Sequence, residues 1–408
     1  MKSLKSMRLH IGVFGRTNVG KSSLLNRITN QEISIVSDIA GTTTDVVEKS
    51  MELLPVGPVT FLDTAGLDDN TELGEKRVEK TMKILNRIDV AVIVCDFNKI
   101  AVGQSIDTNN FLGDYEKELI EKLNELKIPY LVVVNKCDLA AGQDCVATIE
   151  DNSNIIYTSA KNDERLVYKF KEALVKLLPE GFVNSPKIVG DLVPPKSTVV
   201  LVIPIDKEAP KGRIILPQVQ TLRDLLDNDC LSFVVKESEL EDALANLNTP
   251  PALVITDSQA FRQVAEIVPE NIPLTSFSIL FARLKGDLKE FAKGAQAIDN
   301  LKDGDMVLIL ESCTHHAIED DIGRVKIPNL LRKKIGKNLV IHNYAGHDFP
   351  DLKDYKLVIH CGACMTNRRE VLSRILIANQ AGVPITNYGI TISYCLGILP
   401  RAIKIFEN

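Results

Sequence analysis

Hydrophobic positions in residues 8–178 form short apolar runs, separated by amphipathic stretches with helical spacing. The runs that predict strands are Ile11–Phe14, Val59–Leu62, Val90–Cys95, Leu131–Val134 and Ile155–Tyr157. Between them, Leu73–Arg87 and Tyr115–Leu126 show the repeat of an amphipathic helix. Strands that alternate with helices are typical of a parallel sheet covered on both faces. We therefore expect an α/β domain over residues 1–180.

Prolines and glycines then interrupt regular structure, which predicts a linker over residues 181–198. A second α/β pattern follows in residues 199–270, where apolar strand runs alternate with short helical repeats. This segment carries no catalytic signature, so packing or self-association is its favoured role. The strands and helices expected there are Val199–Ile205, Val219–Leu226, Leu231–Val235, Leu240–Leu247 and Leu253–Thr256.

A third region covers residues 271–408. Val307–Leu310 and Lys356–Ile359 read as buried strands, and Arg368–Gln380 reads as a helix that ends before Gly382. We recognise no internal repeat in the sequence. The expected fold is α/β throughout, with two smaller α/β domains after the N-terminal one.

Composition and charge narrow the class of protein. The chain has 408 residues and a formal net charge of −6, which argues against nucleic acid as a partner. No apolar run is long enough to cross a membrane, and no leader segment follows Met1. We therefore expect a cytoplasmic protein without a membrane partner. In that reducing compartment its 8 cysteines are expected to be thiols or metal ligands.

A phosphate-binding motif follows the first predicted strand. Gly15-Arg-Thr-Asn-Val-Gly20-Lys21-Ser22 fits G-x-x-x-x-G-K-[ST] and precedes a predicted helix, which is the context of a P-loop. Backbone N–H groups and the helix N-terminus would hold the phosphates. Lys21 would reach the β- and γ-phosphates, and the Ser22 hydroxyl would bind Mg²⁺. The N-terminal domain is therefore expected to be a P-loop nucleotide-binding domain.

Three further motifs follow other strands and indicate guanine nucleotides. In Asp63-Thr-Ala-Gly66, Asp63 would hold Mg²⁺ and the Gly66 N–H would sense the γ-phosphate. In Asn135-Lys136-Cys137-Asp138, the Asp138 carboxylate would accept two hydrogen bonds from guanine that adenine cannot donate. Ser159-Ala160-Lys161, after the last strand, would contact guanine O6. The positions expected to bind GTP or GDP are Gly15, Arg16, Thr17, Asn18, Val19, Gly20, Lys21, Ser22, Ser23, Asp63, Asn135, Lys136, Asp138, Ser159, Ala160 and Lys161.

These four motifs resemble the translation-factor-related small GTPases. Gly41-Thr-Thr43-Thr-Asp45 is similar to switch I of members that act in tRNA modification and ribosome assembly, which makes Thr43 a Mg²⁺ ligand. The expected catalytic set is Lys21, Thr43, Asp63 and Gly66. Leu67 replaces the glutamine that orients water in Ras-like proteins, so hydrolysis should be slow. In the similar subgroup an asparagine at the place of Asn18 helps to bind K⁺.

Three cysteines near the C-terminus indicate a second site. Cys313-Thr-His315 follows one predicted strand, and His360-Cys361-Gly-Ala-Cys364 follows another. Because carboxyl ends of parallel strands meet at one sheet edge, the two segments can converge. A structural zinc site with His315 or His360, a redox pair and inert buried thiols are open alternatives. A three-cysteine 4Fe–4S cluster with one open iron is favoured.

The GTPase motifs, the middle domain and the C-x-H…H-C-x-x-C pattern together resemble the HydF family of FeFe-hydrogenase maturation GTPases. The segment Glu208–Gln218 is also similar to that family. The resemblance implies a 4Fe–4S cluster on Cys313, Cys361 and Cys364, with His315, His360 or Asp191 as candidates for a fourth ligand. It makes residues 199–270 a dimerisation domain and residues 271–408 a cluster-binding domain.

The same resemblance implies a scaffold and carrier that forms a homodimer. It would hold a two-iron precursor of the hydrogenase active site, with two radical-SAM maturases and apo-hydrogenase as partners. GTP state would then control partner association or release. The main alternative is a tRNA-modification or ribosome-assembly GTPase with a structural zinc domain. A nickel or zinc metallochaperone and an iron–sulfur hydrolyase are further alternatives.

Overall fold

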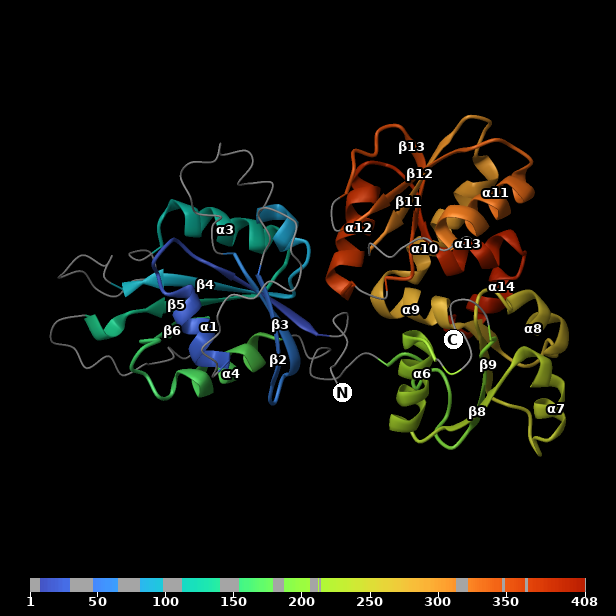
Figure 1. The fold of residues 1–408 in the computed structure, drawn as a ribbon, viewed down its shortest axis with the longest axis horizontal. Helices are drawn as coiled ribbons and strands as arrows, with labels where there is room; N and C mark the ends of the chain where they lie inside the picture. Colours follow the sequence, from blue (N-terminus) through green and yellow to red (C-terminus); the bar gives the residue numbers. More distant parts are fainter. Residues whose placement is uncertain are drawn as a thin grey trace. The chain divides into compact units, whose positions relative to one another are not determined.

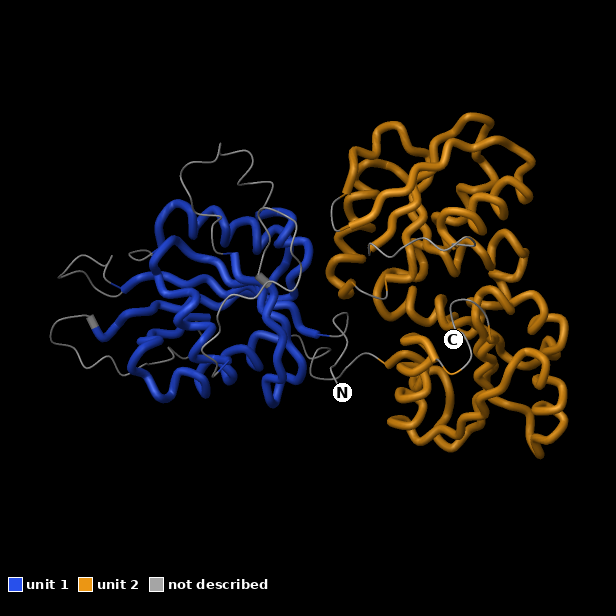
Figure 2. The backbone as a smooth tube through the Cα atoms, viewed as in Figure 1, with its two compact units in different colours: residues 1–185 blue, residues 186–408 orange. Residues whose placement is uncertain are grey.

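A computed structural model of the chain describes residues 8–29, 47–64, 81–97, 112–139, 154–178, 187–205, 212, 214–312, 322–346, 349–363 and 366–407. These residues belong to two compact units, residues 1–185 and residues 186–408, which Figure 2 shows in different colours. Of the predicted sites, Thr43, Gly66, Cys313, His315 and Cys364 lie outside the described residues.

The first unit contains a six-stranded sheet in the order β2-β3-β1-β4-β5-β6 (Figure 1). Its predicted strands are confirmed as the parallel strands β1 (Leu9–Phe14), β3 (Gly57–Asp63), β4 (Val90–Asp96), β5 (Tyr130–Asn135) and β6 (Ile155–Tyr157). Strand β2 (Val47–Leu53) was not predicted and runs antiparallel to β3. Its charged residues Glu48, Lys49 and Glu52 break the apolar run that identifies a strand.

Helices cover both faces of this sheet, as the pattern predicted. Alternate residues of β4 face opposite ways, so Val92 packs with α1 (Lys21–Thr29) and α4 (Leu166–Leu177). On the other face Ile93 packs with α3 (Asp114–Glu125). Figure 1 shows α3 on one side of the sheet and α1 and α4 on the other. This arrangement brings the carboxyl ends of the parallel strands, where ligands bind, to one edge.

The second unit contains two four-stranded sheets, and all of their strands are parallel. The first has the order β10-β9-β7-β8 and the second β12-β11-β13-β14. The strands are β7 (Thr198–Val202), β8 (Leu231–Val235), β9 (Leu253–Thr256), β10 (Leu274–Ser276), β11 (Met306–Glu311), β12 (Val340–Ala345), β13 (Tyr355–His360) and β14 (Ile385–Asn387). The domain boundary expected at residue 270 falls before β10, which belongs to the first of these sheets.

Among the described residues only the first sheet has a helix between its second and third strands, but in both sheets helices connect the first strand to the second and the third to the fourth, and two helices follow the fourth. The helices are α6 (Leu216–Asp227), α7 (Leu240–Ala245), α8 (Phe261–Ile267), α9 (Phe277–Lys285), α10 (Leu288–Gln296), α11 (Ile327–Ile335), α12 (Arg368–Gln380), α13 (Tyr388–Cys395) and α14 (Leu399–Ile403). Apolar side chains of both sheets contribute to one continuous core, to which Val254 and Val358 belong. The two sheets are therefore packed as one unit.

The two halves of this unit are copies of one motif. In each sheet the first strand along the chain lies between the second and the third, and the fourth lies beside the third. Read in that direction, the two orders are β8-β7-β9-β10 and β12-β11-β13-β14. The sequence also repeats, because Pro273-Leu-Thr-Ser-Phe-Ser-Ile corresponds to Pro384-Ile-Thr-Asn-Tyr-Gly-Ile. The expectation that the chain has no internal repeat is therefore wrong. The matching segments are short, and connections of different length separate them, so sequence inspection missed the repeat.

The two halves exchange their last helices. Helix α10 follows α9 in the chain but packs on β14, whereas α14 follows α13 and packs on β10. Helices α9 and α13 pack against each other, and the equivalent residues Ser278 and Gly389 meet there. A Cβ atom on Gly389 would lie 2.5 Å from the Ser278 Cβ. Each half thus completes the core of the other.

We expect Gly294→Ala to destabilise the second unit, because α10 passes directly over β14. An added Cβ at Gly294 would lie 1.9 Å from the Ile385 carbonyl oxygen, and because the nearest atoms are all Ile385 backbone, no side chain can move to relieve the clash. Overpacking of this kind costs about 1–3 kcal/mol. Thermal and urea unfolding of the full chain would measure the loss. The exposed Lys293→Ala on the same helix is the control, and equal stability of the two variants would contradict the packing described.

Candidate functional site

The P-loop lies between β1 and α1, and three of its residues have positive φ angles. The φ angle is 140° at Gly15, 64° at Asn18 and 96° at Gly20. A Cβ at Gly20 would lie 2.2 Å from the Asn135 Nδ2 atom, so only glycine fits this approach. The loop therefore passes tightly over the end of β5. The motif spacing inferred from sequence has a direct steric cause.

Lys21 is buried, and its ammonium group lies within the P-loop. Its Nζ donates to the carbonyl oxygens of Gly15 and Arg16, the latter at 3.0 Å. The Arg16 side chain points away and forms a two-bond ion pair with Glu116 of α3, at 3.0 and 3.1 Å. The role of Glu116 was not predicted from the sequence, because an acidic residue in an amphipathic helix is normally expected to be solvent-exposed. It is buried here and steadies the outer side of the loop.

The residues after β3 and β1 are joined by hydrogen bonds. The Thr64 backbone N–H and hydroxyl both donate to the Val13 carbonyl oxygen, at 3.3 and 2.6 Å. This places the buried Asp63 beside the P-loop, as a Mg²⁺-linked carboxylate requires. Ser22 and Ser23 are exposed at the start of α1. Arg16, Thr17, Asn18 and Val19 complete the loop.

Asn135 connects the phosphate side of the site to the base side. Its Nδ2 donates to the Val19 carbonyl oxygen at 2.9 Å, and its Oδ1 accepts from the Ala160 N–H at 2.9 Å. Next to it, Lys136 has a φ of 66° and forms an ion pair with Asp96 at 2.7 Å. Asn135, at the end of β5, therefore links the P-loop to the segment that contains Ala160, although these parts are far apart in the sequence.

The Asp138 carboxylate is exposed beside the segment Ser159-Ala160-Lys161. The Asn162 side chain donates to Asp138 Oδ2 at 3.2 Å, and the Asn162 backbone N–H donates to Ser159 Oγ at 3.2 Å. This arrangement leaves the carboxylate at the edge of the sheet, where a purine can reach it. The described members of the predicted nucleotide site thus lie along the ends of β1, β3, β5 and β6.

The described part of the predicted cysteine site lies around Cys361. Strands β11 and β13 are neighbours, and Leu310 lies opposite His360. The Cys361 N–H donates to the Leu310 carbonyl oxygen at 2.9 Å. The Ser312 N–H donates to the Cys361 sulfur at 3.3 Å, and the Ser312 hydroxyl oxygen lies 3.3 Å from the same sulfur. Because Cys313 follows Ser312 directly, the chain brings the start of its segment to Cys361.

The environment of Cys361 favours a thiolate. Burial by itself raises the pKa of the Cys361 thiol, whereas His360 and hydrogen bonds from Ser312 and the Ala363 backbone lower it, and the net shift is downward. Arg374 donates a hydrogen bond to His360 Nε2 at 2.7 Å. Thiolate is the form that binds metals.

Two of the candidate fourth ligands are engaged elsewhere. His360 is buried, with Nδ1 2.7 Å from the Cys361 carbonyl oxygen and Nε2 held by Arg374. The Asp191 carboxylate forms a two-bond ion pair with Arg283. Burial raises the pKa of the Asp191 carboxyl, but the hydrogen bonds and the charge of Arg283 lower this pKa by more, so the net shift is downward. Neither side chain can become a ligand without breaking these contacts.

An iron–sulfur cluster is compatible with the described part of this site. Within those residues no three His, Cys, Asp or Glu side chains form a metal-binding group. The donor chemistry nevertheless fits, since N–H and O–H groups stabilise a cluster thiolate and the Cys361 sulfur has the Ser312 N–H and hydroxyl beside it. The repeat adds a contrast: Leu253-Val-Ile-Thr256-Asp257 in the other half matches Leu357-Val-Ile-His360-Cys361. The cysteines occur in only one copy of the motif.

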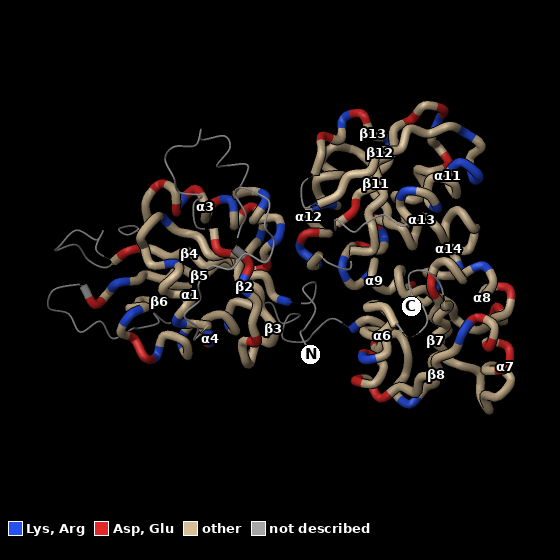
Figure 3. The backbone as a smooth tube through the Cα atoms, in the orientation of Figure 1, with Lys and Arg blue, Asp and Glu red and all other residues tan. Residues whose placement is uncertain are grey.

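Charges of both signs are interspersed along both units (Figure 3). Across the ranges that the structure describes, no helix is long and apolar enough to cross a membrane.

The fold and the P-loop define the first unit as the G domain of a GTPase. A family profile described as 50S ribosome-binding GTPase matches residues 10–136. Two other profiles match the second unit: the hydrogen maturase F dimerization domain over residues 188–286 and the hydrogen maturase F tetramerization domain over residues 289–405. The chain belongs to the hydrogen maturase F (HydF) family, which confirms the resemblance seen in the sequence.

Curated relatives share the G domain. The tRNA modification GTPase MnmE of Prochlorococcus marinus (strain NATL2A) is 37% identical over 172 residues, which is 40% of this chain and 34% of the relative. GTPase Der of a Nitratiruptor species is 30% identical over 200 residues, 45% of this chain and 41% of the relative. The chain thus spans less than half the length of these relatives.

Among solved structures, the G domain of the T. maritima FeoB iron transporter is 19% identical, with a TM-score of 0.30. The match covers 42% of this chain and 98% of that one. Aquifex aeolicus Era bound to GDP.AlF4- is 20% identical with a TM-score of 0.29, covering 56% and 93%.

Proposed function

We propose that this chain is a GTPase scaffold and carrier for the two-iron precursor of the FeFe-hydrogenase active site. It receives the precursor from two radical-SAM maturases and delivers it to apo-hydrogenase. The observation that supports this proposal is the surroundings of the Cys361 sulfur. At the shared edge of β11 and β13 this sulfur accepts a hydrogen bond from the Ser312 N–H and lies 3.3 Å from the Ser312 hydroxyl oxygen, in a chain that also has a GTPase domain. Membership of the HydF family supports the same function.

Cys313, Cys361 and Cys364 are the proposed ligands of a resident 4Fe–4S cluster. Three thiolates leave one iron with an exchangeable position, where an external donor can bind. The contacts of His360 and Asp191 support an open fourth position, because both side chains are already paired. His315 stays a candidate ligand.

The GTPase is proposed to be slow and to depend on Mg²⁺ and K⁺. Ser22, Thr43 and Asp63 would hold Mg²⁺, and Asn18, which is exposed in the P-loop, would contribute to a K⁺ site. Leu67 cannot orient the attacking water. Slow hydrolysis suits a switch, so we propose that GTP state controls when partners bind or leave. Loss of the γ-phosphate would release Thr43 and the segment after Gly66.

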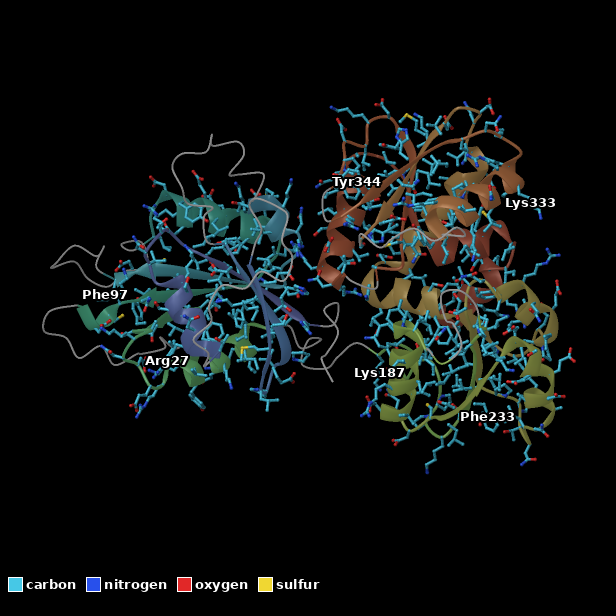
Figure 4. The ribbon with its side chains drawn as sticks, in the orientation of Figure 1. Arg27, Phe97, Lys187, Phe233, Lys333 and Tyr344 are labelled. Carbon is cyan, nitrogen blue, oxygen red and sulfur yellow. The ribbon has the colours of Figure 1, made fainter. Side chains whose placement is uncertain are left out.

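The proposed quaternary structure is a homodimer formed through the middle domain. Strand β8 lies at the edge of its sheet and carries exposed apolar side chains; Leu231 is 58% and Phe233 42% exposed. Figure 4 labels Phe233 on this strand. On α6, Leu226 is 58% exposed. An apolar edge strand favours pairing with another chain, and the dimerization profile covers this segment.

Anaerobic reconstitution followed by iron, sulfide and zinc analysis tests the proposal. We expect about four irons and about four sulfides per chain, with an EPR signal of a reduced 4Fe–4S cluster that added imidazole perturbs. One zinc ion per chain without sulfide would overturn it. The leading function would then be a GTPase with a structural zinc site.

A further inference from the structure

We propose that Arg374 is a positioning residue for Cys361, acting through Ser312 and His360 to aim their hydrogen-bond donors. This inference deepens the proposed function, since its consequence for the cluster rests on Cys361 being a cluster ligand. The contacts themselves are a property of the protein without metal. Arg374 lies in α12, and nothing in the sequence sets it apart from the other basic residues of that helix.

The Arg374 guanidinium joins the ends of three neighbouring strands. One nitrogen, Nη1, donates to Ser312 Oγ after β11 at 2.9 Å and to His360 Nε2 at the end of β13 at 2.7 Å. The other, Nη2, donates to the Gly346 carbonyl oxygen after β12 at 2.7 Å. Arg374 is only 2% exposed, so water does not compete for these bonds. They therefore hold the three strand ends in one arrangement.

A buried guanidinium needs a counter-charge, and Glu370 supplies it. The Glu370 carboxylate lies 2.9 Å from Nη2, one helical turn before Arg374, and both side chains are buried. This pair is neutral overall, which lowers the desolvation cost of keeping the guanidinium at the sheet edge. The pair also restricts the rotamer of Arg374, so its N–H groups point at Ser312 and His360.

The first consequence concerns the Ser312 hydroxyl. A serine oxygen accepts through its lone pairs and donates one O–H. Because Arg374 donates to Ser312 Oγ, the serine O–H is directed elsewhere, and the Cys361 sulfur lies 3.3 Å from that oxygen. A Cys361 thiolate bound to a cluster would carry no proton, so the Ser312 hydroxyl would donate to it. Together with the bond from the Ser312 N–H, the sulfur would then accept two hydrogen bonds from one residue.

The second consequence concerns the His360 tautomer. Arginine can only donate hydrogen bonds, so His360 Nε2 must accept the hydrogen bond from Arg374. Neutral histidine then carries its own proton on Nδ1, which donates to the Cys361 carbonyl oxygen at 2.7 Å. His360 therefore orients the Cys361 backbone and does not serve as the exchangeable ligand. Arg374 thus acts on both the sulfur and the main chain of Cys361.

Hydrogen bonds to cluster thiolates raise the reduction potential, because they stabilise the added negative charge of the reduced state. Weakening them should lower the potential and loosen the cluster. Arg374→Lys keeps the charge opposite Glu370, but one ammonium cannot reach Ser312, His360 and Gly346 with the same geometry. It is therefore the informative variant, whereas removal of the charge would take away the counter-charge that the buried Glu370 has in Arg374.

The test compares the full-length wild type with Arg374→Lys, Ser312→Ala and His360→Gln. Exposed Arg332→Lys, in the same half of the unit, is the matched control. The first readout is ¹⁵N NMR of histidine side chains in the metal-free protein, with the His360 signal assigned by its loss in His360→Gln. We expect the Nδ1–H tautomer in the wild type and in Arg332→Lys, and a mixture of the two neutral tautomers in Arg374→Lys. A wild-type Nε2–H tautomer would overturn the proposal.

The second readout is the reduction potential of the reconstituted cluster. We expect a lower potential in Arg374→Lys and Ser312→Ala than in the wild type. In His360→Gln we expect the reduced-cluster EPR signal to respond to imidazole as in the wild type. Unchanged potentials in both Arg374→Lys and Ser312→Ala would overturn the proposal. If the wild type takes up no cluster, the proposed function fails, while the tautomer measurement still decides the role of Arg374.

Discussion

Asp138→Asn is expected to convert the chain from a GTP-binding to an XTP-binding protein. The Asp138 carboxylate would accept hydrogen bonds from the N1–H and the 2-amino group of guanine. Asparagine offers one acceptor and one donor, so it leaves guanine mismatched and suits the 2-oxo group of xanthine. Hydrogen bonds to a charged group contribute about 1.5–3 kcal/mol each, so losing two should weaken GTP by roughly 10²–10⁴-fold.

Titrations with fluorescent GTP and XTP analogues in the presence of Mg²⁺ would measure this change. Asp163→Asn is the matched control, because Asp163 lies just after the neighbouring segment Ser159-Ala160-Lys161 but accepts hydrogen bonds from the Thr158 hydroxyl and the Arg165 N–H. That variant should keep its preference for GTP. An Asp138→Asn protein that binds GTP as tightly as the wild type would show that Asp138 does not contact the base.

Cys361→Ser is expected to abolish cluster binding and to leave GTP hydrolysis nearly unchanged. Serine keeps the size of the side chain, but its hydroxyl is a poor iron ligand, so the loss tests the thiolate rather than the packing. Hydrolysis should persist because the GTP site and Cys361 lie in separate compact units. Iron should fall from about four per chain to a small residual amount.

Iron and sulfide analysis and a GTP hydrolysis assay on the same preparation would measure both effects. Cys395→Ser is the matched control, since burial raises the pKa of the Cys395 thiol to about 11 and a thiol of this kind is a poor metal ligand. It should retain the full iron content. Unchanged iron in Cys361→Ser would remove Cys361 from the ligand set. A parallel loss of hydrolysis would show that the two units are coupled.

The G domain was largely predictable because its function depends on local backbone chemistry. The P-loop needs glycine where its backbone approaches Asn135, and Lys21 must follow that glycine directly. The motif can therefore be recognised from the sequence without the tertiary structure. The parallel strands were predictable for a similar reason: buried strands are continuous apolar runs. Strand β2 was not, because an edge strand with one exposed face carries charged residues.

The second unit was predictable in its elements but not in its organisation. Strands β8 and β9 and helix α12 were predicted with the bounds that the structure shows. The internal repeat and the exchange of α10 and α14 were missed, because adjacent segments of sequence do not record which sheet a helix packs on. Which sheet a helix packs on depends on shape complementarity and buried area between segments that are far apart in the sequence.

Taken by itself, the sequence determined the α/β class, the nucleotide motifs, the cysteine pattern and the resemblance to the HydF family. Only the tertiary structure decided the partners of the polar groups that support those motifs. Glu116 bracing Arg16 and Arg374 holding Ser312 and His360 are examples. The physical reason is that catalytic and phosphate-binding motifs constrain neighbouring residues in the chain. A buried hydrogen-bond donor needs only an acceptor in space, and folding can bring that acceptor from any distance along the sequence.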